Sequence, residues 1–291
     1  MARATAMSRD EILDNPGAAT AALDAARDAA KSPLPVAPFP PDDLVTLPGG
    51  LSHNGEMLRK VVVKELTGED EEALARAIQN PNPYHFLDTL LARGTVKLGG
   101  LSYDDSQKLL PSLLVGDRDE IILGIRTATY GDTVEVFGWT CPLCSGKVDK
   151  IEFSLKDDVE RKRLSDPASE AVFDVSLRKG ASAKVRLATG AVQTATFEVP
   201  DLLGPQRDDV MLSKCIETYT DTKGQVHLIP GFPSMVRQMS APDRRAILRE
   251  LSDRQPGPRY NEIKFRHEEC GGEVSLALGI TDLFRDLIIG L

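Results

Sequence analysis

The amino-acid sequence predicts an α+β fold in which an N-terminal helical unit precedes a β-rich region. Within residues 67–130, apolar residues recur at the three- and four-residue spacing of helices that bury one face. From residue 132 onward, apolar and polar residues alternate in several short runs, which is typical of strands with one buried face. Two short motifs of cysteine and histidine, each between two such runs, lie far apart in the chain.

Residues 1–56 are predicted to form an extended or flexible N-terminal arm. An Ala-rich stretch at 24–31 favours a short helix, and the segment "SPLPVAPFPPDD" after it is too rich in proline for a helix. The arm is either a flexible leader or a segment that docks on a neighbouring subunit through Phe39 and its prolines. It has no apolar stretch typical of a secretory signal.

Residues 57–131 are predicted to form the helical unit, which opens with a strand over 57–66. A helix then begins at Thr67, because a threonine followed three residues later by Asp70 is typical of a helix start. Two more helices follow, in "NPNPYHFLDTLLARG" and in "YDDSQKLLPSLLVG", where Pro111 interrupts the second.

The last helix of this unit lies in "GDRDEIILGIRTATYG". We expect Asp117 to cap its first turn and Gly131 to end it. Ile121, Ile125 and Ala128 share one face of the helix, which predicts that this face is buried.

Residues 132–291 are predicted to form the β-rich region, with an inserted segment at about 156–258. Its outer strands are expected over 132–140 and 147–155, and over 260–266 and 273–279, before a closing helix. Inside the insertion we expect a linker or exposed helix, a hairpin over 173–187 and two helices, of which the second begins at Ser240.

The two cysteine and histidine motifs predict a structural zinc site. In "CPLCSGK" and "HEECGGE", two potential ligands are separated by two residues and followed by glycine, between alternating strands. This is the form of two zinc knuckles, which would make the β-rich region zinc-ribbon-like. Three thiolates and an imidazole form a closed tetrahedral site with no position for a substrate. The predicted metal ligands are Cys141, Cys144, His267 and Cys270.

Two other interpretations of these cysteines stay open. Cys141 and Cys144 could form a redox pair, although a helix rather than a strand usually follows such a pair. The thiols could also be unpaired beside a surface histidine. The nearby basic residues either balance the negative charge of the metal site or are solvated strand residues; they are Lys147, Lys150, Lys264 and Arg266.

The rest of the sequence contains no constellation for catalysis, so we expect a protein that is not an enzyme. Cys215 lies alone on an apolar helix face and is predicted to be a core residue. The other three histidines are isolated and predicted to be structural: His53, His85 and His227. Phosphate-binding, metalloprotease and nucleophile-elbow motifs are absent.

Composition narrows the choice of partners. The formal net charge is −9 and the sequence pI is about 5.1, which argues against binding to nucleic acid or to an anionic membrane. No apolar run approaches the roughly 20 residues that span a bilayer. A zinc-ribbon module that binds nucleic acid therefore remains only the alternative function.

The combination of these features resembles a known family. The runs "VKELTGEDEEALA" and "LLVGDRDEIILGIRTATYGDTVEV", then "CPLC" and a later Cys/His pair with glycines, resemble baseplate proteins of T-even-type contractile-tailed bacteriophages, whose members act in the hub and its assembly. The resemblance implies the same four metal ligands and no catalytic residues. It implies a virion tail baseplate protein, assembled in the host cytoplasm, whose partners are other baseplate and hub proteins and the tape-measure protein.

Overall fold

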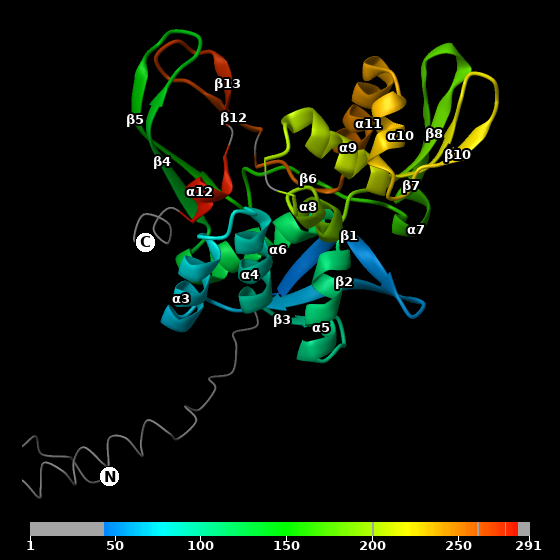
Figure 1. The fold of residues 1–291 in the computed structure, drawn as a ribbon. Helices are drawn as coiled ribbons and strands as arrows, with labels where there is room; N and C mark the ends of the chain where they lie inside the picture. The colour runs from blue at the N-terminus through cyan, green and yellow to red at the C-terminus, as the bar shows by residue number, and fades with distance from the viewer. Residues whose placement is uncertain (1–43, 200, 261, 277, 285–291) are drawn as a thin grey trace, which may run out of the picture. The chain divides into compact units, whose positions relative to one another are not determined.

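The first sheet contains a strand within the residues predicted to form the N-terminal arm. The computed structural model describes residues 44–199, 201–260, 262–276 and 278–284 (Figure 1). Strands β1 (Leu44–His53), β2 (Glu56–Val63) and β3 (Thr95–Leu98) form an antiparallel sheet in that order.

The prediction of an arm was therefore wrong for residues 44–56. The alternation of apolar and polar residues does not indicate this strand, because a Pro-Gly-Gly sequence interrupts it. Around the same sequence, the pairing of β1 with β2 shifts between Thr46 and Leu51. Asn54 and Gly55 have φ angles of 49° and 81°, as a tight hairpin turn requires. The remainder of the predicted arm, with the helix at 24–31 and Phe39, lies outside the described residues.

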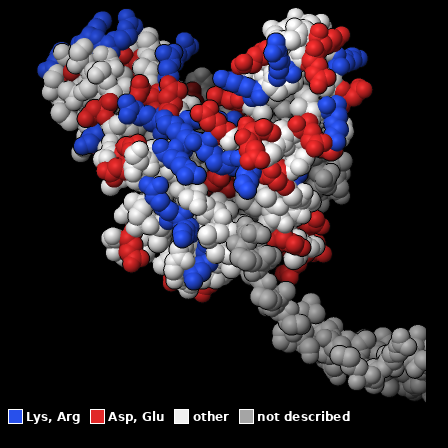
Figure 2. All heavy atoms as spheres, turned by 180° about the vertical axis from the view of Figure 1, so that it is seen from behind, with Lys and Arg blue, Asp and Glu red and all other residues white. Residues whose placement is uncertain are grey.

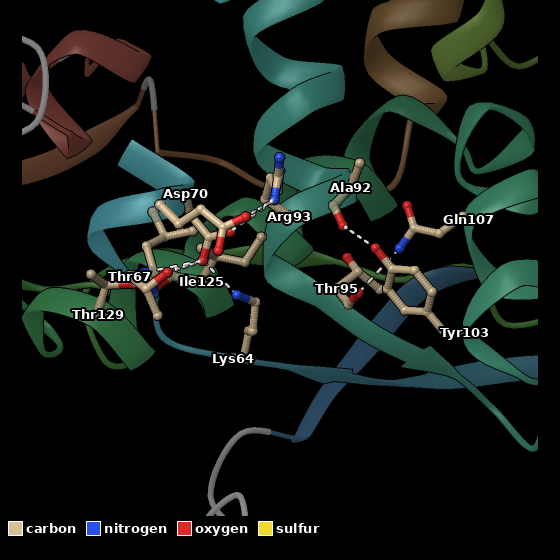
Figure 3. A network of polar contacts seen from close by, with 12 residues as sticks. Lys64, Thr67, Asp70, Ala92, Arg93, Thr95, Tyr103, Gln107, Ile125 and Thr129 are labelled. Carbon is tan, nitrogen blue, oxygen red and sulfur yellow. Dashed lines mark hydrogen bonds and ion pairs between the residues drawn. The ribbon is translucent and has the colours of Figure 1, made fainter. Parts of the chain in front are cut away.

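The helices of the first unit begin and end close to their predicted bounds. They are α3 (Gly68–Ala77), α4 (Tyr84–Gly94), α5 (Tyr103–Leu109) with a 3₁₀ turn over Leu110–Ser112, and α6 (Val115–Tyr130). At the start of α3, the Asp70 carboxylate accepts hydrogen bonds from the Thr67 N–H and hydroxyl and from Lys64 (Figure 3). Burial alone would raise the pKa of Asp70, but these hydrogen bonds outweigh it and the pKa lies below its ordinary value. The capping prediction for α3 is confirmed.

The start of α6 differs from the prediction. The helix begins at Val115 after Leu114, so Asp117 lies inside its first turn and does not cap it. The Asp117 side chain is instead buried, and its Oδ1 accepts a hydrogen bond of 2.6 Å from the Gly49 N–H of β1. Gly131 ends the helix with a φ of 83°, as predicted. Asp117 therefore ties the bulged part of β1 to α6.

We expect Asp117 to make stability depend on pH. Burial raises its pKa to about 6, although the Gly49 and Gly50 amides act in the opposite direction. A carboxyl with a raised pKa in the folded state contributes most stability below its unfolded pKa, and this contribution is lost as pH rises toward 6. Asp119, whose pKa burial raises to about 7, extends the decline.

Asp117→Asn should remove the first part of that decline. Between pH 4 and pH 7, the free energy of unfolding of the wild type should fall relative to the variant by about 3 kcal/mol at most. Urea unfolding at several pH values measures this difference. Parallel pH profiles for the two proteins would contradict the assignment.

The first hydrophobic core joins segments from both ends of the described chain. It includes Leu47 and Val61 of the sheet and Ile121 and Ile125 of α6, and it extends to Phe284. Arg126 of α6 donates from Nε to the Leu283 carbonyl oxygen at 2.6 Å, which fixes α12 (Ile280–Leu283) against this core. Residues after 284, and with them most of the predicted closing helix, lie outside the described residues.

The segment between the two outer hairpins folds around a second hydrophobic core. A short pairing of β6 (Arg161–Lys162) with β11 (Gly257–Pro258) brings its two ends together. Between them lies a four-stranded antiparallel sheet in the order β10-β9-β8-β7. Its strands are β7 (Val172–Ser176), β8 (Ser182–Arg186), β9 (Ile216–Thr220) and β10 (Val226–Leu228). The helices of this segment are α7 (Pro167–Glu170), α8 (Gly190–Ala195), α9 (Gly204–Cys215), α10 (Pro233–Gln238) and α11 (Ala241–Arg254).

The hairpin predicted over 173–187 is present as β7 and β8, and Ser240 caps α11 by accepting a hydrogen bond from the Asp243 N–H at 3.3 Å. The segment near 156–167, predicted as a linker or an exposed helix, is a turn followed by the short strand β6, which agrees with the linker and not with the helix. The pairing of β1 with β2 rules out the predicted boundary at residue 57, whereas the divisions at residue 132 and at 156–258 stay predictions.

The two cores meet where α6 passes the end of α11. Gly116 of α6 lies so close to the backbone that a Cβ there would come within 1.6 Å of the Pro256 carbonyl oxygen. The Arg118 side chain, which is buried, donates to Asp88 of α4 and to Gln193 of α8. Gly190 makes room for it, since a Cβ there would lie 2.1 Å from the Arg118 guanidinium.

Candidate metal centre

Two β-hairpins from distant parts of the chain lie side by side and form the candidate centre. The first consists of β4 (Thr133–Thr140) and β5 (Lys147–Ser154), and the second of β12 (Ile263–Arg266) and β13 (Glu273–Leu276) (Figure 1). Trp139 packs edge-on against Phe265 with ring centroids 5.0 Å apart, and against the His267 ring at 6.1 Å. An aromatic contact therefore joins the hairpins below their turns.

The turns of the two hairpins have the same backbone hydrogen bonds. In the first, the Cys141 N–H donates to the Gly146 carbonyl oxygen and the Ser145 N–H donates to that of Cys141, both at 2.9 Å. In the second, His267 N–H donates to Gly272 at 2.9 Å and Gly271 N–H donates to His267 at 2.8 Å. Ser145 and Gly271 have left-handed φ angles of 62° and 70°.

The two motifs therefore fold as the same tight turn, as their common spacing predicts. Each turn aims its two potential ligands at one point. Because the segment after Cys144 is a strand, the helix expected beside a reactive cysteine pair does not follow here. This weakens the redox interpretation.

The four predicted ligands come together in the structure. Their ligand atoms all lie within 4.8 Å of one another. Cys141 Sγ and Cys270 Sγ are 3.9 Å apart, and His267 Nδ1 lies 3.4 Å from Cys144 Sγ and 3.2 Å from Cys270 Sγ. Cys141 and His267 are buried, while Cys144 and Cys270 are exposed.

These distances fit a tetrahedral metal ion and not a disulfide. With bonds of about 2.3 Å to sulfur and about 2.1 Å to nitrogen, sulfurs lie roughly 3.8 Å apart, and sulfur and nitrogen roughly 3.6 Å apart. A disulfide would need sulfurs about 2.05 Å apart. The residues could thus hold one metal ion, with His267 facing the sulfurs through Nδ1.

The glycine after each left-handed residue lies against a side chain of the opposite turn. A Cβ at Gly146 would come within 2.0 Å of Glu269 Oε2, and a Cβ at Gly272 would come within 2.4 Å of Leu143 Cδ1. The Gly146 N–H also lies 3.4 Å from Cys144 Sγ, where it can donate to the sulfur. Both glycines therefore lie where the two hairpins touch, and the Gly146 N–H also approaches a sulfur, as predicted for such a site.

The basic residues near the site have different roles. Lys150 forms ion pairs with Glu135 and Glu152, at 2.5 and 3.0 Å, so its charge is already balanced. Arg266 donates from Nε to the Gly271 carbonyl oxygen at 3.0 Å and so braces the second turn. Lys147 and Lys264 are exposed strand residues.

Cys215 belongs to the second core, as predicted, and we expect it to be unreactive in the folded protein. It is the last residue of α9 and is buried, and this burial raises the pKa of its thiol to about 12. In metal-free protein, a thiol reagent should modify Cys144 and Cys270 at least about tenfold faster than Cys215. Mass spectrometry of partly labelled protein measures this order, and early labelling of Cys215 would contradict its placement.

The remaining histidines lie away from the centre. His53 ends β1 beside Asn54, His85 is exposed on α4, and His227 of β10 lies 3.3 Å from Asp221. Among the described residues, the group at Cys141 is the one cluster of metal-binding side chains. The sequence did not indicate contacts of Trp139, Phe265 and Glu269 between the hairpins, because only their alternation with polar residues and their nearness to the motifs point to such a contact.

Comparison with known proteins identifies the family. The chain matches the family described as T4 bacteriophage base plate protein over residues 48–285. No curated protein matches it significantly, and no solved structure does. In the part of the chain that the structure describes, no helix is long and apolar enough to cross a membrane. Since the match covers both hairpins, both cores and most of the chain, the chain belongs to the T4-type bacteriophage baseplate protein family.

Proposed function

We propose that this protein is a structural or assembly protein of the hub region of a contractile phage tail baseplate, stabilised by one zinc ion. The observation that carries the proposal is the closed Cys₃His cluster at the tips of two hairpins in a baseplate family member. Zinc is the metal that suits three thiolates and an imidazole in tetrahedral geometry.

The role of the zinc ion would be to hold the chain together. Cys141 and Cys270 are 129 residues apart, so one ion would connect the first hairpin to the C-terminal hairpin across the whole inserted segment. The four protein ligands would fill a tetrahedral coordination sphere and leave no position for a substrate. This supports a protein that is not an enzyme.

The partners we propose are other baseplate and hub proteins, including the tape-measure protein, and not nucleic acid or a membrane. The face in Figure 2 carries a group of Lys and Arg side chains across its middle, with Asp and Glu side chains on several sides. Such interspersed charges, in a chain with a net charge of −9, favour protein partners over a phosphate backbone. Assembly in the host cytoplasm and a place in the virion tail belong to the same proposal.

Two measurements test the proposal separately. Elemental analysis of the purified protein should find one zinc ion per chain, and none in a Cys144→Ser and Cys270→Ser double variant. Quantitative mass spectrometry of purified virions, with cross-linking, should find this chain joined to hub proteins at a fixed copy number. A metal-free native protein would overturn the zinc role, whereas cross-links only to peripheral baseplate proteins would overturn the hub role.

A further inference from the structure

A cavity of about 500 Å³ lies between the two hydrophobic cores. Leu278 on its wall belongs to the first core and Leu251 to the second, and Tyr260 and Met211 pack against these cores. Helices α4, α6, α8 and α11 and the segment around β11 each contribute residues to it (Figure 1). Its volume lies within the range of about 300–1,000 Å³ that is typical of ligand sites in proteins. None of the four residues of the Cys/His cluster lines it, so the cavity is a separate site.

A buried carboxylate lies on the wall of this cavity. Among the described residues that line it, Asp119 of α6 is the one with an acidic side chain, and the Tyr260 hydroxyl donates a hydrogen bond to it. Burial raises the pKa of Asp119 to about 7, although the Arg118 charge and the Tyr260 hydrogen bond act in the opposite direction. A carboxylate accepts up to about four hydrogen bonds. Asp119 therefore has acceptor positions left for a bound group.

Two arginines near this carboxylate are bound to other groups. Arg118 precedes Asp119 on α6, but its two terminal nitrogens donate to side chains of α4 and α8. Arg259 lines the same cavity, and its Nη2 donates to the Gln255 carbonyl oxygen at 3.2 Å. Within the part of the chain that the structure describes, no ion pair joins Asp119 to a cation. A bound cation would supply the missing positive charge.

The rest of the wall suits an organic cation. Tyr84 and Tyr260 bring aromatic rings to the cavity, and cations are attracted to the faces of such rings. Burial raises the pKa of both hydroxyls, so the two side chains stay neutral. The methylene groups of an alkyl stem can contact the apolar side chains of Val115, Met211 and Leu248. A calcium or magnesium ion would need more oxygen ligands than one carboxylate provides.

We propose that this cavity binds an organic cation, an ammonium or guanidinium group on an alkyl stem, which pairs with Asp119. The cation occupies the remaining acceptor positions of the carboxylate in a charge-assisted hydrogen bond, and the stem lies against the apolar wall. Such a group belongs either to a lysine or arginine side chain of a neighbouring protein or to a free amine. Because residues of both cores line the cavity, the bound cation also links the two cores.

Titration of the full chain with butylammonium chloride, followed by the methyl NMR signals of Met211 and Leu248, tests the proposal. We expect saturable shifts of both signals, and much smaller shifts with 1-butanol, which has the same stem without the charge. N-acetyl-lysine methylamide distinguishes the two sources of the cation. Binding of this compound as tightly as butylammonium supports a side chain of a neighbouring protein, whereas binding of butylammonium alone supports a free amine.

Asp119→Asn should weaken the binding of butylammonium by about tenfold or more, because it keeps the shape of the side chain and removes its charge. Asp104→Asn is the matched control. It lies on α5, is exposed and does not line the cavity, so it changes the net charge equally and should bind as the wild type does.

A second variant keeps Asp119 and fills the cavity. Ser252 of α11 is exposed and lines the cavity, so Ser252→Trp adds bulk at its rim and should also weaken binding by about tenfold or more. This variant provides the same test if Asp119→Asn does not fold. A wild type without saturable shifts, equal binding of 1-butanol, or wild-type affinity in the folded Asp119→Asn protein would overturn the proposal.

Discussion

On the proposed zinc role, removal of the metal from the purified protein should lower its melting temperature by about 10 °C. A ligand present at a thousandfold excess over its Kd stabilises the native state by roughly 4 kcal/mol, and a chain of this size loses about 2–4 °C per kcal/mol. The effect should appear first in the hairpins, because a metal bound by the exposed Cys144 and Cys270 would join the two hairpins near the surface. Hydrogen exchange should show lost protection in β4, β5, β12 and β13 before the second core.

The control for this experiment is a comparison of metal-free proteins. Cys144 is exposed, so its replacement by serine removes a ligand without opening a cavity in the core. Cys144→Ser should therefore melt about 10 °C below the wild type when zinc is present, and at the same temperature as the wild type after chelation. If the variant and the wild type melt together in zinc, the cluster does not stabilise the fold through a metal.

Gly116→Ala should be among the most destabilising single substitutions in the described chain. The added Cβ would lie 1.6 Å from the Pro256 carbonyl oxygen and 2.8 Å from Gly257 Cα, and both neighbours are backbone atoms that no side-chain rotation can move. Separating α6 from β11 to relieve this overlap would disturb the contact between the two cores. We expect a loss of about 3 kcal/mol or more in the free energy of unfolding, measured by urea denaturation.

Gly100→Ala is the matched control for Gly116→Ala. Nothing lies within 4 Å of a Cβ at Gly100, and its backbone is outside the left-handed region. This variant should therefore unfold within about 0.5 kcal/mol of the wild type. Similar losses for the two variants would mean that Gly116 does not hold the close approach described above.

The sequence predicted the Cys/His cluster better than the sheets because the information for the cluster is local. Two residues between ligands, a following glycine and flanking alternation are all visible within ten positions, and the structure repeats the same turn at Cys141 and His267. What joins the two turns is not local. The packing of Trp139 on Phe265 depends on residues 126 positions apart that only the fold brings together.

The errors in the predicted fold have the same origin. β1 was assigned to the arm because Pro48 and the two glycines after it break the alternation, yet its inner residues are buried by α6. Asp117 has the sequence context of a cap, but tertiary contact with Gly49 takes its carboxylate into the core. In both cases a tertiary contact with residues far along the chain determines the structure, and the local sequence pattern does not.

The pairing of β6 with β11 has a consequence for how the chain can vary. Arg161 and Lys162 enter the inserted segment directly beside Gly257 and Pro258, where it returns, and the Arg259 N–H donates to the Glu160 carbonyl oxygen at 2.8 Å. The two ends of the inserted segment therefore lie side by side, where the chain leaves the rest of the fold and returns to it. Residues gained or lost in loops of the inserted segment, such as the β9–β10 turn, therefore leave the β6–β11 pairing in place, and with it the spacing of the two hairpins that carry the Cys/His cluster.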